Sequence, residues 1–563
     1  MAGPGGGPPW AGLDQWRILA SDGGPDFLAA WSAWRQDPLR PRLLHYAAIA
    51  AHPVSLDELQ SAAQALPQGG ELLAQLAPQW QGFVPGFHRL ALEGGRVLLT
   101  LCVGDAAAML RELSLQADAV VLAADDGTSW DLPTLKVLTR LCRREATLRA
   151  EDAAVAHDLA TCGWQVESSP PGGGLAARYA PAWEIRRRTD TPARLPGECV
   201  VVGAGLAGAA AAASLARRGW SVQVIDRAPQ PAAGASSLPA GLLAPHQSPD
   251  DNLLSRLSRA GVRITLQEAR TRLAAGIEWE DTGVLEWRGD DHRPLPTLGD
   301  GLLPWSREAD APRKAAGGIE PGTAAWWHEN AGWIEPAALV RSWLREPRVR
   351  FMPGREVARI VREGSDWRLE DAQGNAIAQA PLVIVAAALA SAPLLQDRLA
   401  LRPVRGQVAW APHGDDAIDL PSFPVNGHGH FLPRVPLVER QAWITGSTYG
   451  RGDADASLRS EDVAANLQRV EEALPRAAAV MRGAAARGEL RSWSGVRCTS
   501  SDRRPLVGEI EEGLWASTAM GSRGLTFAAL CGELLAAQLH QEPLPLEARL
   551  AQALDARRQR AGT

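Results

Sequence analysis

The stretch Cys199-Val-Val-Val-Gly-Ala-Gly-Leu-Ala-Gly208 combines a short apolar run with a glycine-rich turn. We predict a buried strand over 200–202 and a second strand over 221–225 from their short apolar runs. Between them, the alanine-rich stretch 209–218, which is followed by Gly219, predicts a helix. Together these elements form one βαβ unit, the architecture that holds a dinucleotide at its first turn.

Three glycines in this stretch have the spacing of a dinucleotide turn, Gly-x-Gly-x-x-Gly. Gly203 permits the tight turn, Gly205 lets the backbone approach a pyrophosphate, and Gly208 lets helix and strand lie close together. The helix N-terminus then faces the phosphates, and Asp226, after the second strand, can hold ribose hydroxyls. A glycine triplet alone would also suit an ordinary strand–helix turn, but strand, helix and acid in register predict a dinucleotide site.

The length and composition are those of a large globular protein. The chain has 563 residues, with 46% hydrophobic and 22% charged residues, so we expect two or three domains. Its N-terminus lacks a basic segment followed by an apolar one, which predicts no signal peptide. The longest apolar stretch, 381–395, is interrupted by proline and serine, so we expect no membrane span.

Charge and cysteine content narrow the function classes further. A net charge of −6 gives no global attraction to nucleic acid, so such a partner would need a local patch. No cysteine pair has the Cys-x-x-Cys spacing, which favours a cytoplasmic location and no metal site. The six cysteines are Cys102, Cys142, Cys162, Cys199, Cys498 and Cys531.

A segment rich in proline and glycine divides the chain. Pro170-Pro-Gly-Gly-Gly174 ends a first domain that we place at 1–175, and an arginine-bearing linker follows at 176–197. A second domain extends over 198–545, and 546–563 is expected to be a polar helical tail.

The second domain holds more than one mononucleotide unit. Residues 348–359 and 367–371 alternate in polarity as antiparallel strands do, and 382–387 is the apolar run of a buried strand. A late glycine loop, 519–526, opens the apolar helix 527–539. The N-terminus of that helix can lie against the pyrimidine edge of a flavin and stabilise negative charge there.

These segments resemble the glycine oxidase and D-amino acid oxidase superfamily of FAD enzymes, and within it the oxidoreductase half of the MnmC family of bacterial tRNA-modifying proteins. The motifs that carry the resemblance are 200–226, 234–236, 403–407, 446–449, 495–498 with Asp502, 505–508 and 521–525. The resemblance implies a mixed α/β and α+β chain. Its expected parts are an FAD-binding Rossmann-type domain with an inserted antiparallel-sheet substrate domain, preceded by a Rossmann-like methyltransferase domain.

The resemblance also implies an activity. In the MnmC family the oxidase removes the carboxymethyl group from 5-carboxymethylaminomethyl-(2-thio)uridine at the tRNA wobble position, and the methyltransferase then methylates the freed amine with S-adenosylmethionine. We therefore expect an FAD-dependent amine oxidoreductase whose partner is tRNA bearing that uridine. The superfamily's covalent-flavin cysteine or histidine has no counterpart, so noncovalent FAD is expected, in a monomer.

The group to be removed is an N-substituted glycine, so its carboxylate needs a cation, and an arginine fork suits it. By resemblance, Arg497 and Arg523 lie on the two late motifs that face the flavin, and Tyr449 can cover the substrate; these three are the implied catalytic residues. The ordinary alternatives are ion pairs for the arginines and core packing for the tyrosine. His246 is expected to be a satisfied structural histidine. The implied cofactor-binding residues are Gly203, Ala204, Gly205, Leu206, Ala207, Gly208, Asp226, Arg227, Ser236, Gly521, Ser522, Gly524 and Leu525.

The first domain keeps the outline of the MnmC methyltransferase but departs from it at the cofactor-binding positions. The departures are Ala20, Asp22 and Gly24 in place of a Gly-x-Gly-x-Gly turn, Ala50 in place of the ribose-binding acid, and 123–128 in place of an Asp-Gly-Phe-x-Pro segment. Binding S-adenosylmethionine needs a backbone that can approach the ligand and an acid that accepts two hydroxyl hydrogen bonds. We therefore expect a degenerate methyltransferase-like domain that does not bind S-adenosylmethionine, kept as a tRNA-binding or docking module or as support for the oxidase.

Two other functions remain open at this point. One is a free small-amine oxidase acting on glycine, sarcosine or a D-amino acid; the other is a noncatalytic tRNA-binding protein in which both halves have decayed. The extra domain favours tRNA over a free amine, and the intact flavin motifs favour catalysis.

Overall fold

The structure is a computed structural model that describes residues 9–123, 129–167, 174–184, 194–288, 299–437 and 440–559. Contacts divide the chain into two compact units, Met1–Leu195 with Ala536–Gln552, and Pro196–Leu535 with Ala553–Thr563. Within the described ranges, no helix has both the length and the apolar character needed to cross a membrane.

The first unit is built on an eight-stranded sheet in the order β3-β4-β2-β1-β5-β6-β8-β7. The five strands from β4 to β6 are parallel, and antiparallel strands close both edges. This confirms the Rossmann-like fold expected for this part. The strands are β1 (Gln15–Ala20), β2 (Leu43–Ala50), β3 (Gly86–Leu92), β4 (Val97–Val103), β5 (Ala117–Leu122), β6 (Cys142–Ala150), β7 (Trp164–Glu167) and β8 (Leu175–Tyr179).

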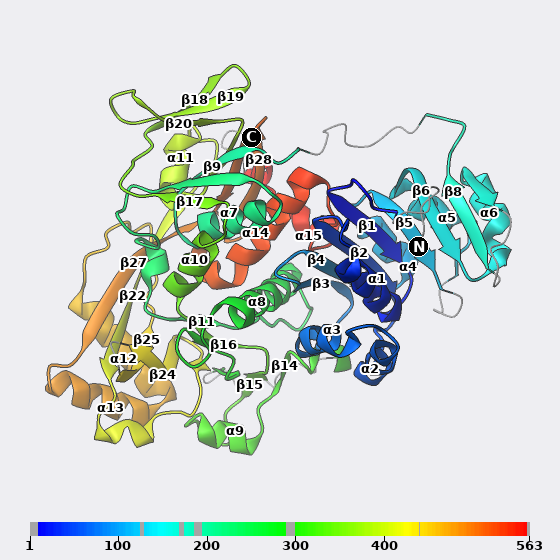
Figure 1. Cartoon of the computed structure of the whole chain (residues 1–563). Coiled ribbons are helices and arrows are strands. Elements are labelled where there is room, and N and C mark those ends of the chain that lie inside the picture. Colours follow the sequence, from blue (N-terminus) through cyan, green and yellow to red (C-terminus); the bar gives the residue numbers. More distant parts are fainter. Residues whose placement is uncertain are drawn as a thin grey trace. The chain divides into compact units, whose positions relative to one another are not determined.

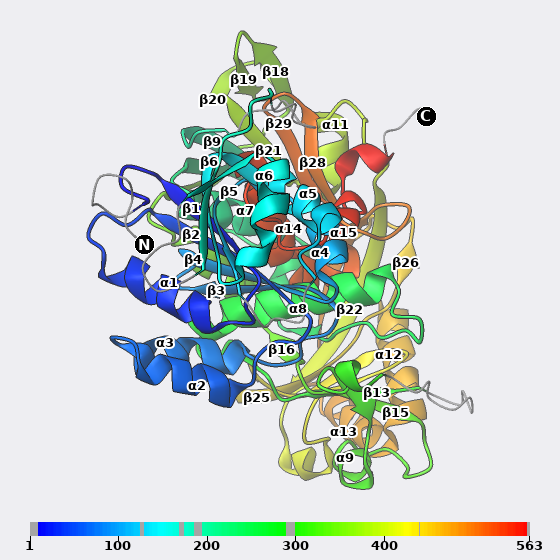
Figure 2. The same cartoon turned by 90° about the vertical axis from the view of Figure 1, so that its right-hand side faces the viewer.

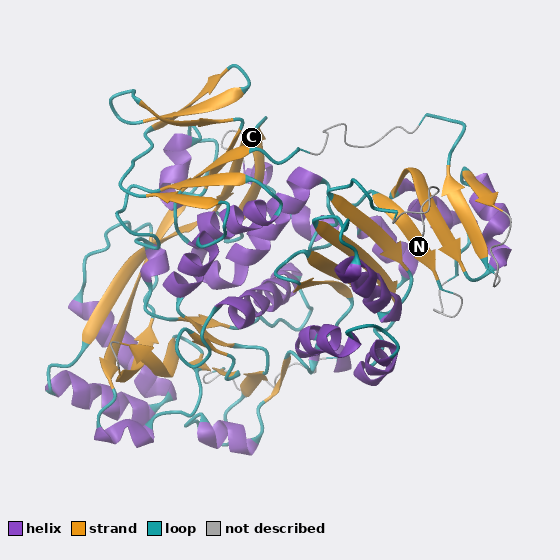
Figure 3. Ribbon diagram, viewed as in Figure 1, coloured by secondary structure: helices purple, strands orange, loops and turns teal. Residues whose placement is uncertain are grey.

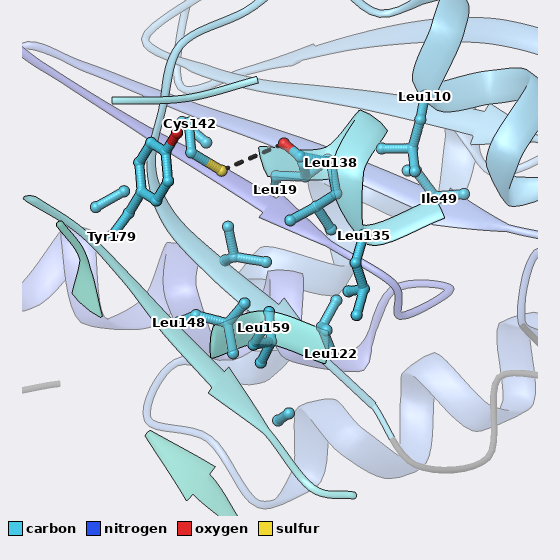
Figure 4. Packing of buried hydrophobic residues seen from close by; sticks show 14 of the residues in the cluster. Leu19, Ile49, Leu110, Leu122, Leu135, Leu138, Cys142, Leu148, Leu159 and Tyr179 are labelled. Carbon is cyan, nitrogen blue, oxygen red and sulfur yellow. Dashed lines mark hydrogen bonds between the residues drawn. The ribbon is translucent and has the colours of Figure 1, made fainter. Parts of the chain in front are cut away.

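Helices cover both faces of this sheet because successive strand residues point to opposite sides. In β1, Leu19 joins one buried cluster and Ile18 joins the other. Figure 4 shows part of the first cluster, in which the Cys142 thiol donates to the carbonyl of Leu138 at 3.4 Å. The helices are α1 (Pro25–Gln36), α2 (Leu56–Gln64), α3 (Gly69–Leu76), α4 (Ala106–Glu112), α5 (Leu132–Arg140), α6 (Ala156–Thr161) and α15 (Ala548–Gln552).

The segment Ala536–Gln552 belongs to the first unit although it lies near the end of the chain. Within that unit, Arg17 donates to the carbonyl of His540 at 3.4 Å, and Arg549 N donates to Glu112 at 3.0 Å. The sequence predicted a polar tail over 546–563. The structure corrects this prediction, because Leu546, Leu550 and Leu554 are buried. Only Leu550 lies in α15; Leu546 precedes this short helix and Leu554 follows it.

The boundaries drawn from the sequence also shift at the linker. The strand β8 (Leu175–Tyr179) pairs with β6 and β7, so the beginning of the segment expected as linker, 176–197, completes the first unit's sheet. Arginines 186–188, which the sequence placed in the linker, lie outside the described residues.

The second unit contains a six-stranded nucleotide-type sheet in the order β17-β10-β9-β21-β29-β28, parallel except for β28. The predicted βαβ unit is confirmed, with the helix beginning at Leu206, earlier than predicted. Figure 1 shows α7 and α10 beside this sheet. The elements are β9 (Glu198–Val202), α7 (Leu206–Arg217), β10 (Ser221–Ile225), α8 (Leu253–Arg272), α10 (Pro336–Leu344), β17 (Val349–Met352), β21 (Leu382–Val385), α11 (Ser391–Leu394), β28 (Leu506–Glu511), β29 (Leu514–Thr518) and α14 (Gly524–His540).

One strand prediction is corrected. Residues 348–359 were expected to be antiparallel, but β17 within them runs parallel to β10. Antiparallel pairing begins only afterwards, in a separate three-stranded sheet of β18 (Arg359–Glu363), β19 (Asp366–Glu370) and β20 (Ala376–Ala380). Alternating polarity reports which face is buried and does not report the direction of the neighbouring strand.

Between the strands of the nucleotide sheet, the chain forms a larger and mostly antiparallel substrate sheet in the order β14-β15-β13-β23-β24-β25-β22-β26, with β27 also paired to β22. This confirms the inserted antiparallel-sheet domain (Figure 3). The strands are β13 (Val284–Trp287), β14 (Ser306–Glu308), β15 (Ala325–His328), β22 (Arg402–Pro412), β23 (Val425–Asn426), β24 (His430–Leu437), β25 (Arg440–Gly446), β26 (Gly450–Arg451) and β27 (Arg491–Thr499).

Helices α12 (Ser460–Ala473) and α13 (Pro475–Ala486) lie beside this sheet (Figure 2), and their apolar residues share a buried cluster with Phe431 and Trp443. The unit also contains α9 (Ala311–Ala316) and a small sheet of β11 (Gly241–Leu243), β16 (Gly332–Ile334) and β12 (Trp279–Glu280).

Candidate functional site

The glycine turn after β9 can accept no side chains at two of its three glycines. Gly203 has φ +108°, and a Cβ there would lie 2.5 Å from the carbonyl oxygen of Ala386. A Cβ at Gly208 would lie 1.9 Å from the carbonyl oxygen of Gly203. Close approach of backbone to backbone therefore explains both glycines, as the βαβ prediction required.

Gly205 directly precedes the first residue of α7. A Cβ added at Gly205 would lie 3.1 Å from the hydroxyl of Ser236. That hydroxyl accepts a hydrogen bond from Leu206 N at 3.1 Å, so the short helix η3 (Ala235–Ser237) lies against the N-terminus of α7. Ala204 lies in the turn, and Leu206 and Ala207 form the first turn of the helix. Backbone N–H groups and the helix dipole at such an end favour a phosphate.

Asp226 lies directly after β10, next to the glycine turn. One carboxylate oxygen accepts from Ala204 N at 2.7 Å and the other from Ala228 N at 2.8 Å. Each oxygen has a second lone pair, so the carboxylate can still accept ribose hydroxyls. The side chain of Arg227 is exposed and lies 3.7 Å from Glu356.

The N-terminus of α14 lies beside that of α7. A Cβ at Gly524 would lie 3.2 Å from Leu206 Cδ1, and a Cβ at Gly241 would lie 2.7 Å from Leu525 Cδ1. Gly521 and Ser522 form the preceding short helix η7 (Gly521–Arg523), where Gly521 has φ +60°. The two helix ends and the glycine cradle fit an FAD: the turn at 203–208 with Asp226 would hold its nucleotide part, and 521–525 would lie along its flavin.

Arg497 projects from β27 over a glycine of the neighbouring strand. Its guanidinium donates to Ser447 Oγ at 2.5 Å, to the carbonyl of Arg405 at 3.3 Å and to that of Thr448 at 3.4 Å. A Cβ at Gly406 would lie 2.3 Å from both terminal nitrogens of Arg497. The missing side chain at 406 therefore makes room for the guanidinium.

Tyr449 lies between charged side chains. The guanidinium of Arg497 lies 5.7 Å from its ring centre, which is a cation–π distance. Burial lowers the pKa of Arg497 and of Arg523, and Tyr449 acts electrostatically on both in the opposite direction. The three implied catalytic residues are thus brought into one neighbourhood, with Tyr449 42% exposed at its surface.

The two arginines make no close ion pair in the part of the chain that the structure describes, although Glu286 acts electrostatically on Arg523 from a greater distance. Among the described residues, no carboxylate oxygen lies within 4.0 Å of Arg497 or of Arg523. A half-buried guanidinium such as that of Arg497, with no carboxylate beside it among the described residues, is costly, and an anionic ligand would relieve that cost. The arrangement therefore suits a small carboxylate.

The pKa values of two histidines near these arginines are lowered. Burial, and then the charge of Arg523, lowers the pKa of His246; burial, and then Arg497, lowers the pKa of His430 to about 4. The main-chain N of His246 donates to Ser258 Oγ at 2.8 Å. His430 was missed by the sequence reasoning because nothing local connects it to Arg497.

A hydrogen-bonded line of side chains lies in the same sheet. Ser306 Oγ is 2.8 Å from His328 Nδ1, and His328 Nε2 is 3.2 Å from Glu286. Burial pushes the pKa of Glu286 up, but His328 and Arg288 outweigh it and hold the pKa at about 2. Ser306 and His328 are fully buried, so this line is structural and not a nucleophilic triad.

The comparisons with known proteins agree with this geometry. A family described as FAD dependent oxidoreductase (DAO) matches residues 198–538. Glycine oxidase from Bacillus cereus has a TM-score of 0.51 at 20% identity, covering 63% of this chain and 98% of that one. L-proline dehydrogenase from P. horikoshii has 0.52 at 17%, covering 65% and 98%. At these identities the structural likeness shows the fold alone, but with the family match the chain is an FAD-dependent oxidoreductase.

Relatives over the whole length define the family more narrowly. The tRNA 5-methylaminomethyl-2-thiouridine biosynthesis bifunctional protein MnmC of Polaromonas naphthalenivorans is 46% identical over 97% of this chain and 90% of its own. The protein of that name from Polaromonas sp. strain JS666 is 47% identical over 97% and 91%. The chain belongs to the MnmC family.

Proposed function

We propose that this protein oxidises the modified wobble uridine of tRNA with noncovalently bound FAD. It removes the carboxymethyl group of 5-carboxymethylaminomethyl-(2-thio)uridine and leaves 5-aminomethyl-(2-thio)uridine and glyoxylate. Membership of the MnmC family supports the substrate class. The observation that carries the chemistry is Arg497, whose guanidinium lies 5.7 Å from the ring centre of Tyr449 with no carboxylate within 4.0 Å among the described residues, while Arg523 is close enough for Tyr449 to act on it electrostatically.

The chain's own residues bind and orient the glycine-like arm of the substrate. Arg497 and Arg523 hold its carboxylate, and the exposed ring of Tyr449 covers it. Their positive charge also disfavours the protonated form of the substrate amine, which must lose its proton before oxidation. When bound, FAD would supply the two-electron oxidant for removal of hydride from the methylene carbon. Because the amine is already unprotonated, loss of hydride leaves an iminium ion without a strong protein base, and water hydrolyses that ion to the primary amine and glyoxylate.

We further propose that the first unit no longer binds S-adenosylmethionine. At the turn before α1, one oxygen of Asp22 accepts from Gly24 N and Asp26 N, both at 3.0 Å, and the other accepts from the Tyr46 hydroxyl at 2.6 Å. Burial raises the pKa of this carboxyl against the effect of those hydrogen bonds. The side chain thus occupies the N-terminus of α1, where a cofactor would approach the backbone.

Buried side chains also lie close to Gly24 in the turn before α1. A Cβ at Gly24 would lie 2.9 Å from Leu59 and 3.2 Å from Trp80, both buried side chains. At the end of β2, Ala50 offers no carboxylate for a ribose. The residues present do not fit the cofactor, so we infer that another enzyme methylates the aminomethyl product. The segment 124–128, where the sequence also departs from the family, lies outside the described residues.

A cytoplasmic location and a monomeric state remain predictions from the sequence. All six cysteines are free and buried, which is compatible with a reducing compartment. Sedimentation of the flavin-loaded protein tests the monomer.

Anaerobic bleaching of the flavin tests the proposed activity. Carboxymethylaminomethyl-bearing tRNA should bleach the wild-type flavin, and glycine or sarcosine should not. Arg497→Met should keep the flavin spectrum but slow bleaching by tens to hundreds of fold, because a lost charge-assisted contact costs about 2–4 kcal/mol. Arg476→Met, at an exposed site on α13, is the matched control and should react like the wild type.

Each other outcome points to a different function. Equal bleaching by free glycine would make the protein a small-amine oxidase. Binding of tRNA with no bleaching by any of these substrates would make it a noncatalytic tRNA-binding protein. Normal bleaching of Arg497→Met would assign the carboxylate to Arg523 alone.

A further inference from the structure

A hollow lies at the rim of the substrate sheet, next to the position of Arg497. It is formed by the turn between β23 and β24, the end of β25 and one side of α12. The side chains that matter for its chemistry are Trp287, His428, His430, Asn466 and Arg469.

Two aromatic side chains form one wall. The rings of Trp287 and His428 are 5.6 Å apart at 69°; the indole is half-buried and the imidazole is exposed. Two glycines allow the turn to lie close to its neighbours. A Cβ at Gly427 would lie 3.1 Å from Trp287, and one at Gly429 would lie 3.2 Å from the carbonyl oxygen of Gly446. The wall is thus held in a definite shape.

The floor carries polar atoms that are shielded from solvent and have no partner among the described residues. Asn466 is 1% exposed; its Nδ2 donates to the carbonyl of Gln407 at 3.0 Å, whereas its Oδ1 is unpartnered. Nε2 of His430 is also unpartnered. Buried polar atoms without hydrogen bonds are costly, so both are ready to receive a polar ligand.

The hollow is joined to the carboxylate-binding position by one residue. Arg469 donates to the carbonyl oxygen of Ser447 at 3.2 Å, while Arg497 donates to the hydroxyl of that serine. Among the described residues, no carboxylate oxygen lies within 4.0 Å of Arg469. A second cation is therefore free to bind an anion directly beside the first.

We propose that this hollow binds a nucleotide adjacent to the wobble uridine in the single-stranded anticodon loop, an inference that rests on the proposed function. Its base stacks against Trp287 and His428, its polar edge meets Asn466 and His430, and Arg469 contacts its phosphate. Single-stranded RNA is recognised by this combination of aromatic stacking, base-edge hydrogen bonds and arginine.

Binding of an unmodified anticodon stem–loop tests the subsite without any turnover. Each protein, at equal flavin occupancy, would be titrated into a fluorescein-labelled RNA, and binding would be followed by anisotropy. The proteins compared are the wild type, Trp287→Ala, His428→Ala and Arg469→Gln. Removing one stacking partner should raise Kd by about 5- to 100-fold. Arg469→Gln should make the slope of log K against log salt shallower by about 0.7. Arg476→Gln, exposed on α13 and outside the hollow, should bind as the wild type does.

The outcomes separate this proposal from the proposed function. Wild-type affinity and salt slope in all three variants would overturn the subsite while leaving the oxidation of tRNA intact. Loss of RNA binding in the variants, together with no flavin bleaching by modified tRNA in the wild type, would support the subsite and overturn the oxidation. Failure of the wild type to bind the RNA overturns the subsite, while the bleaching assay with modified tRNA still decides the oxidation. If Trp287→Ala loses flavin, the Kd of His428→Ala for the RNA decides whether the aromatic wall binds a base, because His428 is exposed.

Discussion

Adding one methyl group at Gly406 should disable the carboxylate site without unfolding the protein. The new Cβ would lie 2.3 Å from both terminal nitrogens of Arg497, whereas ordinary contacts begin at 3.4 Å, so the guanidinium must withdraw by about 1 Å. A displacement of that size costs up to about 100-fold in rate. We therefore expect Gly406→Ala to lower kcat/KM by about 10- to 100-fold, or about 1.4–2.7 kcal/mol.

The stability should change little, because the group that yields is the end of a flexible side chain. The free energy of unfolding is expected to stay within about 1 kcal/mol of the wild type. Anaerobic flavin bleaching by modified tRNA measures the activity, and thermal unfolding measures the stability. Gly322→Ala is the control, since nothing lies within 4 Å of its Cβ and its φ is ordinary.

A double variant tests the mechanism directly. Because Gly406 acts through Arg497, Gly406→Ala combined with Arg497→Met should be no slower than Arg497→Met alone. Additive losses, or wild-type kcat/KM in Gly406→Ala, would refute the idea that this glycine exists to make room for the guanidinium.

Three further results are expected. Asp226→Ala should weaken FAD retention by about 1–3 kcal/mol through the loss of a charge-assisted acceptor; full flavin occupancy at limiting FAD would contradict the assignment. Calorimetric titration of S-adenosylmethionine into the protein should give no isotherm at micromolar concentrations, and a stoichiometric one would show that the first unit is not degenerate. The pKa of His430 is lowered from 6.5 to about 4, so the native state binds fewer protons than the unfolded state in that interval. The free energy of unfolding should therefore fall as pH falls from about 6.5 towards 4. His430→Gln should flatten that dependence in urea titrations, and an unchanged slope would show that His430 does not titrate this way.

Local patterns predicted the nucleotide-binding elements well. The strands 200–202 and 221–225 and the helix after Gly205 depend on neighbours close in sequence, and β9, α7 and β10 occupy those places. Prediction failed where the partner was distant. The direction of β17 depends on its pairing with β10, which lies more than a hundred residues earlier in the chain, and the burial of Leu546, Leu550 and Leu554 cannot be seen in their local sequence.

The amino-acid sequence by itself determined the βαβ unit and the glycine turn followed by Asp226, because each is a statement about residue identity at a fixed local spacing. Only the tertiary structure decided how the catalytic neighbourhood is assembled. Gly406 and Arg497 are far apart in the chain and meet because β22 and β27 pair in register. His430 and Arg469 approach that position through β24 and α12. Strand register and helix docking are set by packing summed over the whole unit, so no short stretch of sequence carries them.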